Sequence, residues 1–547
     1  MGNRPLRLPW HAPAGAVRIT AATQGKTATE ALCRGGFGVQ ATGLDELLDQ
    51  ALPPVLTEAR RTLEQHIFKD CADIVVQSML VGGRVGGLLV YTRGLADADL
   101  MADNVVRPLL FELAEAPLSD LSPERLSGAG LGSGSVAVGQ TYKDAAVAVL
   151  DGKAALLVDG YGQCLTFDVK GGKRRSVEEP PSEVVVRGPR EGFNEDLSTS
   201  VSLLRLKLRT PRLKAIQWRM GAQTQTRVML LYLEGVADSE VIAEARRRLE
   251  AIEIDGVLES GYIESFIEDL PWSPFPQLLN SERPDTVAAQ LLEGRFAIMI
   301  DGSPFALYAP VTFWQIFQTP EDYYERFLIG SFLRSLRLVF GMISLFLPAL
   351  YVAVITFHQD MLPTSLMLSI ASAREAIPFP ALVEATMMEL SFEGLREAGV
   401  RLPKTVGQAV SILGALVIGQ AAVEAGIVSA PMVIIVSLTG IASFTVPHFN
   451  GAISLRLLRF PLMLLGGTFG LVGIALGALW IGIHLCWLRS FGVPYLSGVA
   501  PFRASDAKDL LVRAPWWAMV RRPGGLGGAN RRRMDRGQKP QAPSSRR

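Results

Sequence analysis

Hydrophobic and polar residues are distributed differently in the two parts of this chain. Up to about Arg337 the composition is that of a water-soluble protein, whereas long apolar runs follow one another from Leu338 to Leu488. The first run, 338–357, contains about 20 residues without a charge, enough for a helix rising 1.5 Å per residue to cross a hydrocarbon core of roughly 30 Å. The pattern predicts a soluble head followed by a membrane domain.

Three further apolar runs follow, at 407–428, 431–447 and 461–488. The last is long enough to cross with strong tilt or to contain a break at its glycines. A single such run is also typical of a buried helix in a soluble protein, but four in succession favour a polytopic α-helical membrane domain with at least four spans.

The head contains an internal duplication. Residues 89–97 match residues 230–238, and residues 152–160 match residues 294–302, at an offset of about 141 residues. Each half has the pattern of a strand, a turn and a helix, then a strand closed by an Asp-Gly turn. We therefore expect a head made of two related α/β subdomains.

Composition sets the boundaries between these parts. We expect a disordered leader at 1–44, subdomain 1 at 45–178, a linker at 179–194, subdomain 2 at 195–330, a helical membrane domain at 331–502 and a basic disordered tail at 503–547. The arginines of the linker, at 187–192, either bind an anion or belong to a structured connector with solvated charges, and the connector is favoured.

Local charges predict the orientation of the chain in the membrane, whereas the net charge of +1 says little about it. The first 20 residues contain no apolar segment typical of a secretory signal peptide. Arg334 and Arg337 precede the first run, and the loop at 358–360 has no Lys or Arg, so the positive-inside rule places the head in the cytoplasm. A cytoplasmic tail then requires an even number of spans: either the acidic helix described next does not cross, or the last run is a hairpin.

A helix of about 22 residues is predicted between Pro380 and Pro403, because prolines bound it on both sides. Its acids at i, i+4 and i+8 form one stripe: Glu389, Glu393 and Glu397, with Glu384 earlier on the same helix. Pro378, Pro380 and Pro403 are candidate hinges. A charge at the bilayer centre costs about 2.5–3.5 kcal/mol, which excludes acids facing lipid. The helix either lies in the interface or lines an aqueous cavity where cations pass.

Two other groups of residues have candidate roles. Small residues in the run after Pro403 permit close helix packing: Gly407, Gly414 and Gly419. The basic tail suits anionic lipid, at roughly 1 kcal/mol per basic residue near the surface, with a candidate interface made of Trp516, Trp517, Arg521 and Arg522. Nucleic acid is a less favoured partner for a membrane protein, and we expect none.

Catalytic motifs are missing from the sequence. The four cysteines form no CxxC pair, the glycine-rich segments lack P-loop spacing, and no nucleophile motif or HExxH helix occurs. We therefore expect a protein that is not an enzyme and that holds neither a metal nor another cofactor.

Several motifs, in order, resemble one family. They are Glu321–Arg326, Leu347–Ala353, the acidic helix with its flanking prolines, and Phe491–Leu496, with Glu183–Phe193 and Glu282–Asp285 in the head. They resemble the A subunit of the GerA family of spore germination proteins, and the similarity extends from about residue 60 to Phe502. The leader and the tail look particular to this chain.

The resemblance implies a membrane subunit of a nutrient germinant receptor in the inner membrane of an endospore. It implies a transporter-like B subunit and a lipoprotein C subunit as partners, and a homo-oligomer around a path for monovalent cations. It also favours Glu389, Glu393 and Glu397 as pore or vestibule residues. A paralogue that amplifies germination signals shares the same motifs, and an ion-coupled transporter or a membrane-anchored scaffold are alternatives of another class.

Overall fold

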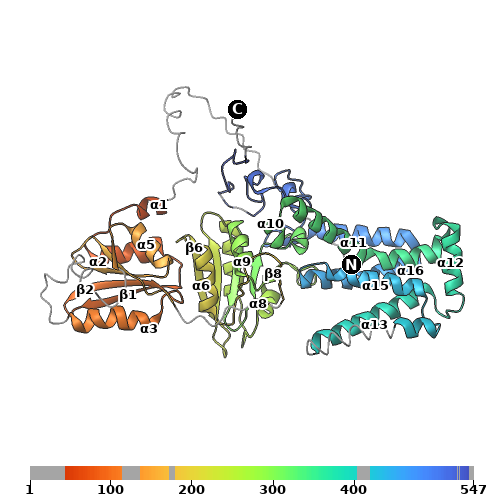
Figure 1. Cartoon of the computed structure of the whole chain (residues 1–547), viewed down its shortest axis with the longest axis horizontal. Coiled ribbons are helices and arrows are strands. Elements are labelled where there is room, and N and C mark those ends of the chain that lie inside the picture. Colours follow the sequence, from red (N-terminus) through yellow and green to blue (C-terminus); the bar gives the residue numbers. More distant parts are fainter. Residues whose placement is uncertain are drawn as a thin grey trace, which may run out of the picture. The chain divides into compact units, whose positions relative to one another are not determined.

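The computed structural model describes residues 43–113, 136–171, 179–402 and 419–540, apart from 181, 527 and 529 (Figure 1). The expected leader therefore lies almost entirely outside the described residues. The same holds for Pro403, Gly407 and Gly414 and for most of the expected span at 407–428.

Subdomain 1 is built on a five-stranded antiparallel sheet with the strand order β1-β2-β4-β5-β3. Its strands are β1 (Ile74–Val81), β2 (Val85–Thr92), β3 (Val136–Gly139), β4 (Ala154–Val158) and β5 (Cys164–Phe167). Its α-helices are α1 (Gly43–Leu48), α2 (Leu56–Thr62), α3 (Ala98–Met101) and α5 (Tyr142–Leu150). Both faces of β4 are buried, so this strand lies in the core.

Subdomain 2 repeats this topology. Its sheet has the order β6-β7-β9-β10-β8, the same as in subdomain 1 when the strands are matched in chain order. The strands are β6 (Leu213–Met220), β7 (Thr226–Leu233), β8 (Leu279–Ser281), β9 (Phe296–Ile300) and β10 (Ala306–Ala309), and the helices are α6 (Leu197–Lys207), α7 (Ser239–Glu250), α8 (Ser260–Ile267) and α9 (Pro284–Leu292). The duplication predicted from sequence is confirmed.

The matched residues explain why both halves fold alike. Asp97 and Asp238 occupy equivalent positions and cap α3 and α7, accepting hydrogen bonds from backbone N–H groups of the first turn. Gly160 and Gly302 follow the equivalent strands β4 and β9 with φ of 86° and 90°, a conformation that favours glycine. The Asp-Gly pairs therefore end both strands by the same local mechanism.

Buried arginines join the parts of the head. Arg205 is buried on α6 and donates two hydrogen bonds to the buried Asp73 of subdomain 1, at 2.6 and 2.9 Å. Arg283 donates to the carbonyl oxygens of Glu183 and Pro189 in the linker, at 3.2 and 2.8 Å. The linker arginines, 187 and 190, lie 3.9 Å from Glu325 and Glu179, as expected for a structured connector.

The region after the head is helical. It contains α10 (Glu321–Tyr324), α11 (Phe327–Phe357), α12 (Thr364–Arg374), α13 (Ala381–Arg401), α15 (Ala430–Phe444) and α16 (Phe449–Trp487). Among the described residues, two helices are long and apolar enough to cross a membrane, α11 and α16. The run expected as a span at 431–447 forms the shorter apolar helix α15.

Helix α16 reverses direction at Gly470, which has the non-helical angles φ 61° and ψ −144°. A Cβ placed on Gly473 would lie 2.1 Å from the carbonyl oxygen of Leu465, and one on Gly477 would lie 2.5 Å from Leu462. Such residues are far apart in a straight helix. Residues 449–469 and 471–487 therefore form two antiparallel arms of about 31 and 26 Å. The sequence allowed a break at the glycines of this run, and the break is confirmed.

The helices lie lengthwise against the first arm of α16. Along α11, Ser344 contacts Arg459 and Ala349 lies beside Gly466. Along α13, Leu382 lies beside Gly467 and Glu389 contacts Arg459. Helix α11 is therefore parallel to this arm, whereas α13 is antiparallel to it and is an integral member of the bundle.

The segment 503–540 was expected to be disordered, and in the structure it packs on the rest of the chain. Met519 and Leu526 are buried in it. Arg334, buried near the start of α11, pairs with Asp509 at 2.8 Å, and Arg533 pairs with Glu293 beside the end of α9. The physical reason is that a buried arginine requires an acidic partner, which this segment supplies.

Candidate functional site

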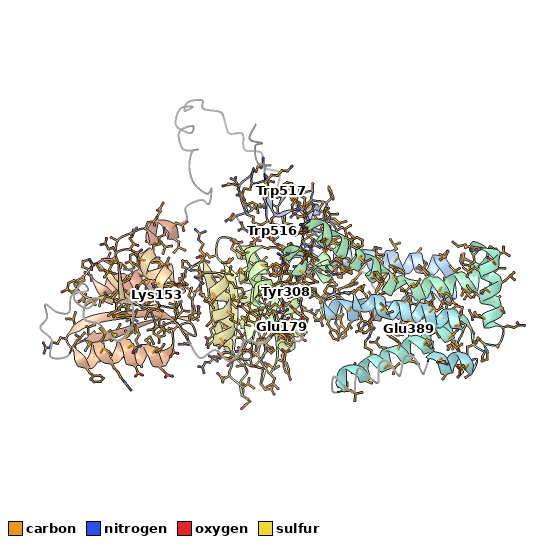
Figure 2. The ribbon with its side chains drawn as sticks, viewed as in Figure 1. Lys153, Glu179, Tyr308, Glu389, Trp516 and Trp517 are labelled. Atoms are coloured by element: carbon orange, nitrogen blue, oxygen red, sulfur yellow. The ribbon has the colours of Figure 1, made fainter. Side chains whose placement is uncertain are left out.

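Helix α13 has the bounds that its flanking prolines predict. It begins at Ala381, directly after Pro380, whose φ of −59° and ψ of 151° are incompatible with helix, and it ends at Arg401. Figure 2 shows Glu389 within the helical bundle. The four candidate acids differ in burial and in their partners, so they do not form the single acidic stripe that the sequence predicts.

Glu389 is held in the interior of the bundle. Its side chain is 2% exposed and pairs with Arg459 of α16, which is 3% exposed. Arg459 also donates to the backbone oxygen and hydroxyl of Ser344, at 2.9 and 3.1 Å. Ser344 lies six residues after Leu338, which places this pair about 9 Å into the first apolar run.

Glu393 lies one turn further along α13 and is 41% exposed. It pairs with Arg456 of α16 at 3.2 Å and with Arg396 at 3.5 Å. Arg396 donates to the Ser443 hydroxyl at 2.7 Å, and its guanidinium lies 4.4 Å from the centre of the Phe444 ring. Three arginines thus neutralise two acids where α13, α15 and α16 meet.

Glu384 and Glu397 lie at opposite ends of α13. Glu384 is fully buried, accepts a hydrogen bond from the Ser429 backbone N–H at 2.6 Å and lies 3.5 Å from Arg374. Glu397 is 62% exposed and pairs only with Arg401 on the same helix among the described residues. Glu384 therefore ties α13 to the start of α15, whereas Glu397 faces outward.

The described residues leave one face of α13 exposed. Its exposed residues follow helical spacing: Val383, Leu390, Ser391, Gly394, Glu397, Ala398 and Arg401. The face changes from apolar near Pro380 to small and charged near Arg401. This face and the arginine-paired acids behind it form the candidate functional site.

The pairing of Arg456 and Arg459 with these acids was not predicted from the sequence. Arg456 and Arg459 are three residues apart in an otherwise apolar run, and Glu389 and Glu393 are four apart, so the members of each pair lie on one face of their helix. Two basic and two acidic residues at helical spacing, each pair in apolar surroundings, are the feature of the sequence from which the pairing of these two helices could have been predicted.

The other candidate residues have mixed positions. A Cβ placed on Gly419 would lie 3.5 Å from the Val433 side chain, an ordinary van der Waals distance. Trp516 lies between Arg513 and Arg533, each within 6 Å of its ring, and Lys539 lies over Trp517. Arg522 donates to the backbone oxygen of Leu292. Figure 2 shows both tryptophans in the C-terminal segment, where much of their surface contacts protein.

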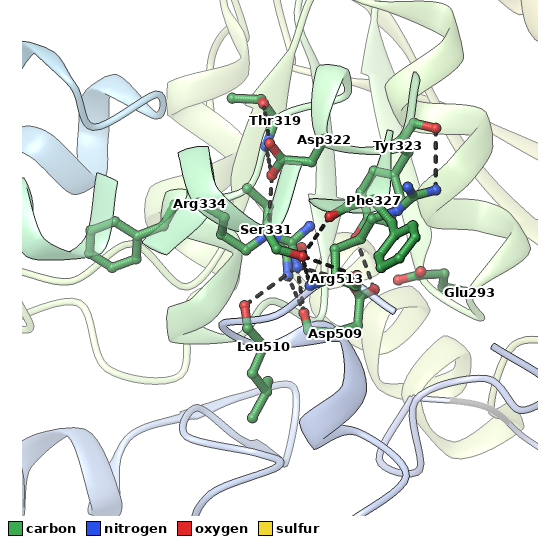
Figure 3. Close-up of polar contacts among 12 residues, drawn as sticks. Glu293, Thr319, Asp322, Tyr323, Phe327, Ser331, Arg334, Asp509, Leu510 and Arg513 are labelled. Atoms are coloured by element: carbon green, nitrogen blue, oxygen red, sulfur yellow. Dashed lines mark hydrogen bonds and ion pairs between the residues drawn. The ribbon is translucent and has the colours of Figure 1, made fainter. Parts of the chain in front are cut away.

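The start of α11 is held by a second ionic cluster, shown in Figure 3. Arg334 pairs with Asp322 at 3.1 Å and with Asp509 at 2.8 Å, and Arg337 also pairs with Asp322. Burial raises the pKa of Asp509 above its usual value, although Arg334 acts in the opposite direction. The cluster links α10, α11 and the C-terminal segment at the point where the head meets the bundle.

Comparison with known proteins identifies the family. The family described as Bacillus/Clostridium GerA spore germination protein matches residues 62–524. This chain belongs to the GerA family. The relatives of this GerA protein include the "Uncharacterized membrane protein YfkQ" of Bacillus subtilis, 54% identical over 88% of this chain and 94% of the relative. "Spore germination protein KA" of the same organism is 45% identical, covering 87% of each chain.

Further similarities concern other GerA proteins. "Spore germination protein GerLA" of Bacillus cereus is 42% identical over 82% of this chain and 92% of the relative. The crystal structure of the N-terminal domain of the A subunit of the Bacillus megaterium spore germinant receptor GerK3 is 31% identical, with a TM-score of 0.38, and covers 48% of this chain and 98% of that domain.

Proposed function

We propose that this GerA protein is the membrane subunit of a spore germinant receptor and that several copies form a channel releasing monovalent cations when nutrient is sensed. The observation that carries the channel proposal is α13, a helix with four acids that packs lengthwise in an apolar bundle and has one face that the described residues leave exposed. Family membership supports the germination role.

The cost of exposing charge to lipid supports a pore or vestibule at this face. If α16 crosses the membrane, α13 beside it crosses too, and each charge facing hydrocarbon would cost about 2.5–3.5 kcal/mol. Additional copies of the chain that surround an aqueous path would keep Glu393 and Glu397 hydrated. Glu384 and Glu389, both buried and paired, would then hold α13 in position.

The ion pairs suggest how such a channel opens. In the structure the acids are neutralised by Arg456, Arg459 and Arg396, so Glu393 offers little net attraction to a cation. Nutrient binding elsewhere in the receptor would favour a state in which Glu393 separates from Arg456 and turns to the water path. This is a population shift between two arrangements of α13 against α16, with Pro378 and Pro380 as the hinge at one end.

Membrane topology is part of the same proposal. The Ser490 hydroxyl donates to the backbone oxygen of Gln277 in the head, at 2.7 Å, and Asp509 pairs with Arg334. These contacts support placing the head and the C-terminal segment on one side of the membrane, the cytoplasmic side. A hairpin in α16 supplies the even number of crossings that this requires. We propose the spore inner membrane as the location, the B and C subunits as partners, and no catalysis.

Potassium release from spores tests the channel role. The double variant Glu393→Gln, Glu397→Gln is expected to change the rate of release while the protein still accumulates and assembles, because the buried pair of Glu389 with Arg459 is kept. Asp103→Asn is the control, because this acid is exposed in subdomain 1 and pairs only with Arg107 among the described residues. Unchanged release from a normally assembled double variant would reject the pore role.

A deletion strain separates receptor from amplifier. Potassium release is measured with nutrients supplied one at a time. Loss of the response to one nutrient would identify a receptor subunit for that nutrient, whereas a slower response to all nutrients would indicate the amplifying paralogue.

A further inference from the structure

The head carries an exposed aromatic surface that the channel proposal does not use. It consists of Tyr262 and Phe266 on the outer face of α8 and of Trp272 in the loop that follows. Trp272 is 95% exposed, although tryptophan is usually well covered in a soluble domain. The opposite face of α8 packs into the core through Ile263 and Ile267, so the outer aromatics are not needed to fold subdomain 2.

This surface is attached to the ends of both arms of α16. Ser273, the residue after Trp272, hydrogen-bonds through its hydroxyl to His484 Nε2 of the second arm at 2.9 Å. The Ser454 hydroxyl of the first arm donates to the carbonyl oxygen of Pro274. Trp272 is therefore placed where the two arms meet the head.

The second arm continues the aromatic surface. Trp480 and Trp487 lie one turn to either side of His484 and are exposed, and the rings of Trp480 and His484 are stacked 6.0 Å apart. Tryptophan and tyrosine concentrate at the two membrane–water interfaces, where their rings lie at the level of the lipid headgroups. Trp480, Trp487 and Trp272 thus form one aromatic group at the head-side end of a candidate span.

We propose that Trp272, with Phe266 and Tyr262, is seated in the headgroup layer of the membrane, so that α8 of subdomain 2 rests on the bilayer surface. The proposal relies on the crossing of the membrane by α16, which belongs to the proposed function. The ligand is the boundary between headgroups and acyl chains of zwitterionic lipid. The charged residues of α8 and of its two flanks are all acidic, so attraction to anionic lipid does not explain the surface; they are Glu259, Glu264, Glu268 and Asp269.

Site-specific fluorescence tests the proposal on the full chain. The four native cysteines are replaced by serine, and a single cysteine is introduced by Trp272→Cys and labelled with the dye NBD. The protein is reconstituted in phosphatidylcholine vesicles containing lipid that is spin-labelled either near the headgroup or deep in the acyl chain. Leu476→Cys, exposed on the second arm of α16, and Val147→Cys, exposed on α5, are the matched positions.

The expected result is quenching at position 272 by the shallow spin label, comparable in size with the quenching at position 476 by the deep one, and none at position 147. The quenching at 272 should stay the same when part of the lipid is anionic. Phe266→Cys should behave like Trp272→Cys, which guards against a local defect at one position.

Two results would overturn the proposal and differ in meaning. Quenching at 476 without quenching at 272 would mean that α16 crosses the membrane but α8 does not touch it, whether water or another protein covers the surface. Absence of quenching at 476 would mean that α16 does not cross the membrane. That result would reject both the channel and the contact of Trp272 with lipid.

Discussion

Removal of the Glu389 carboxylate by Glu389→Ala should destabilise the helical bundle by about 3 kcal/mol. Both partners of the Glu389–Arg459 pair are almost fully buried. Truncating one member of a buried ion pair costs about 3–5 kcal/mol, because the other charge remains without a partner. The insertion cost of a charge at the bilayer centre, about 2.5–3.5 kcal/mol, agrees with the lower end of this range.

The Ser344 contacts limit the loss. Arg459 would keep its hydrogen bonds to the backbone oxygen and hydroxyl of Ser344, so it would lose its counter-charge but not all of its polar partners. We therefore take about 3 kcal/mol as the expected change. For a helical region of roughly 200 residues, 1 kcal/mol corresponds to a shift of about 2–4 °C, so Tm should fall by about 6–12 °C.

Thermal unfolding in detergent, followed by the fluorescence of the tryptophans of α16, measures this shift. Glu397→Ala is the matched control on the same helix. Its carboxylate is 62% exposed and pairs with an exposed arginine, and an exposed pair contributes less than about 1 kcal/mol. The double variant Glu389→Leu, Arg459→Leu should regain most of the lost stability, because no charge is left buried.

The reasoning is refuted if Glu389→Ala unfolds at the temperature of the Glu397→Ala control. A buried pair that can be broken without cost would mean that water reaches Arg459 in the native state. Glu389 would then be assigned to the lining of the aqueous path and not to the interior of the bundle.

Three further predictions follow from other parts of the chain. Gly470→Ala should destabilise the hairpin by about 1–3 kcal/mol in the same assay, because its φ is 61° and a Cβ would lie 2.7 Å from His358. Gly482→Ala, with open space around its Cβ, should not lower stability. Asp73→Ala should cost about 3–5 kcal/mol in denaturant unfolding, because the buried Arg205 loses its partner; a change below that of Asp103→Ala would contradict this. Burial raises the pKa of Glu183 to about 7, above the unfolded value of about 4.3, so its unfavourable contribution grows as pH rises from about 4.3 to 7. Relative to the wild type, Glu183→Gln should gain stability over that window, and a pH-independent difference would contradict the assignment.

Features set by short-range backbone chemistry were predictable from the sequence. The duplicated strands, their Asp-Gly turns and the capping aspartates Asp97 and Asp238 all act within a few residues, so the two sheets could be anticipated from the matching segments. The ends of α13 followed from its prolines for the same reason. The apolar lengths of α11 and α16 and the possible break in the last run were also visible in the chain.

The partners of the charged residues depended on the tertiary structure. Glu389 and Arg459 are 70 residues apart, and Asp509 lies 175 residues from Arg334. No local rule decides which of several acids at i, i+4 and i+8 becomes buried, since this depends on where α16 turns back and brings Arg456 and Arg459 against α13. The same limit explains the C-terminal segment: its basic composition predicted disorder, but a buried arginine on α11 provides the site on which it folds.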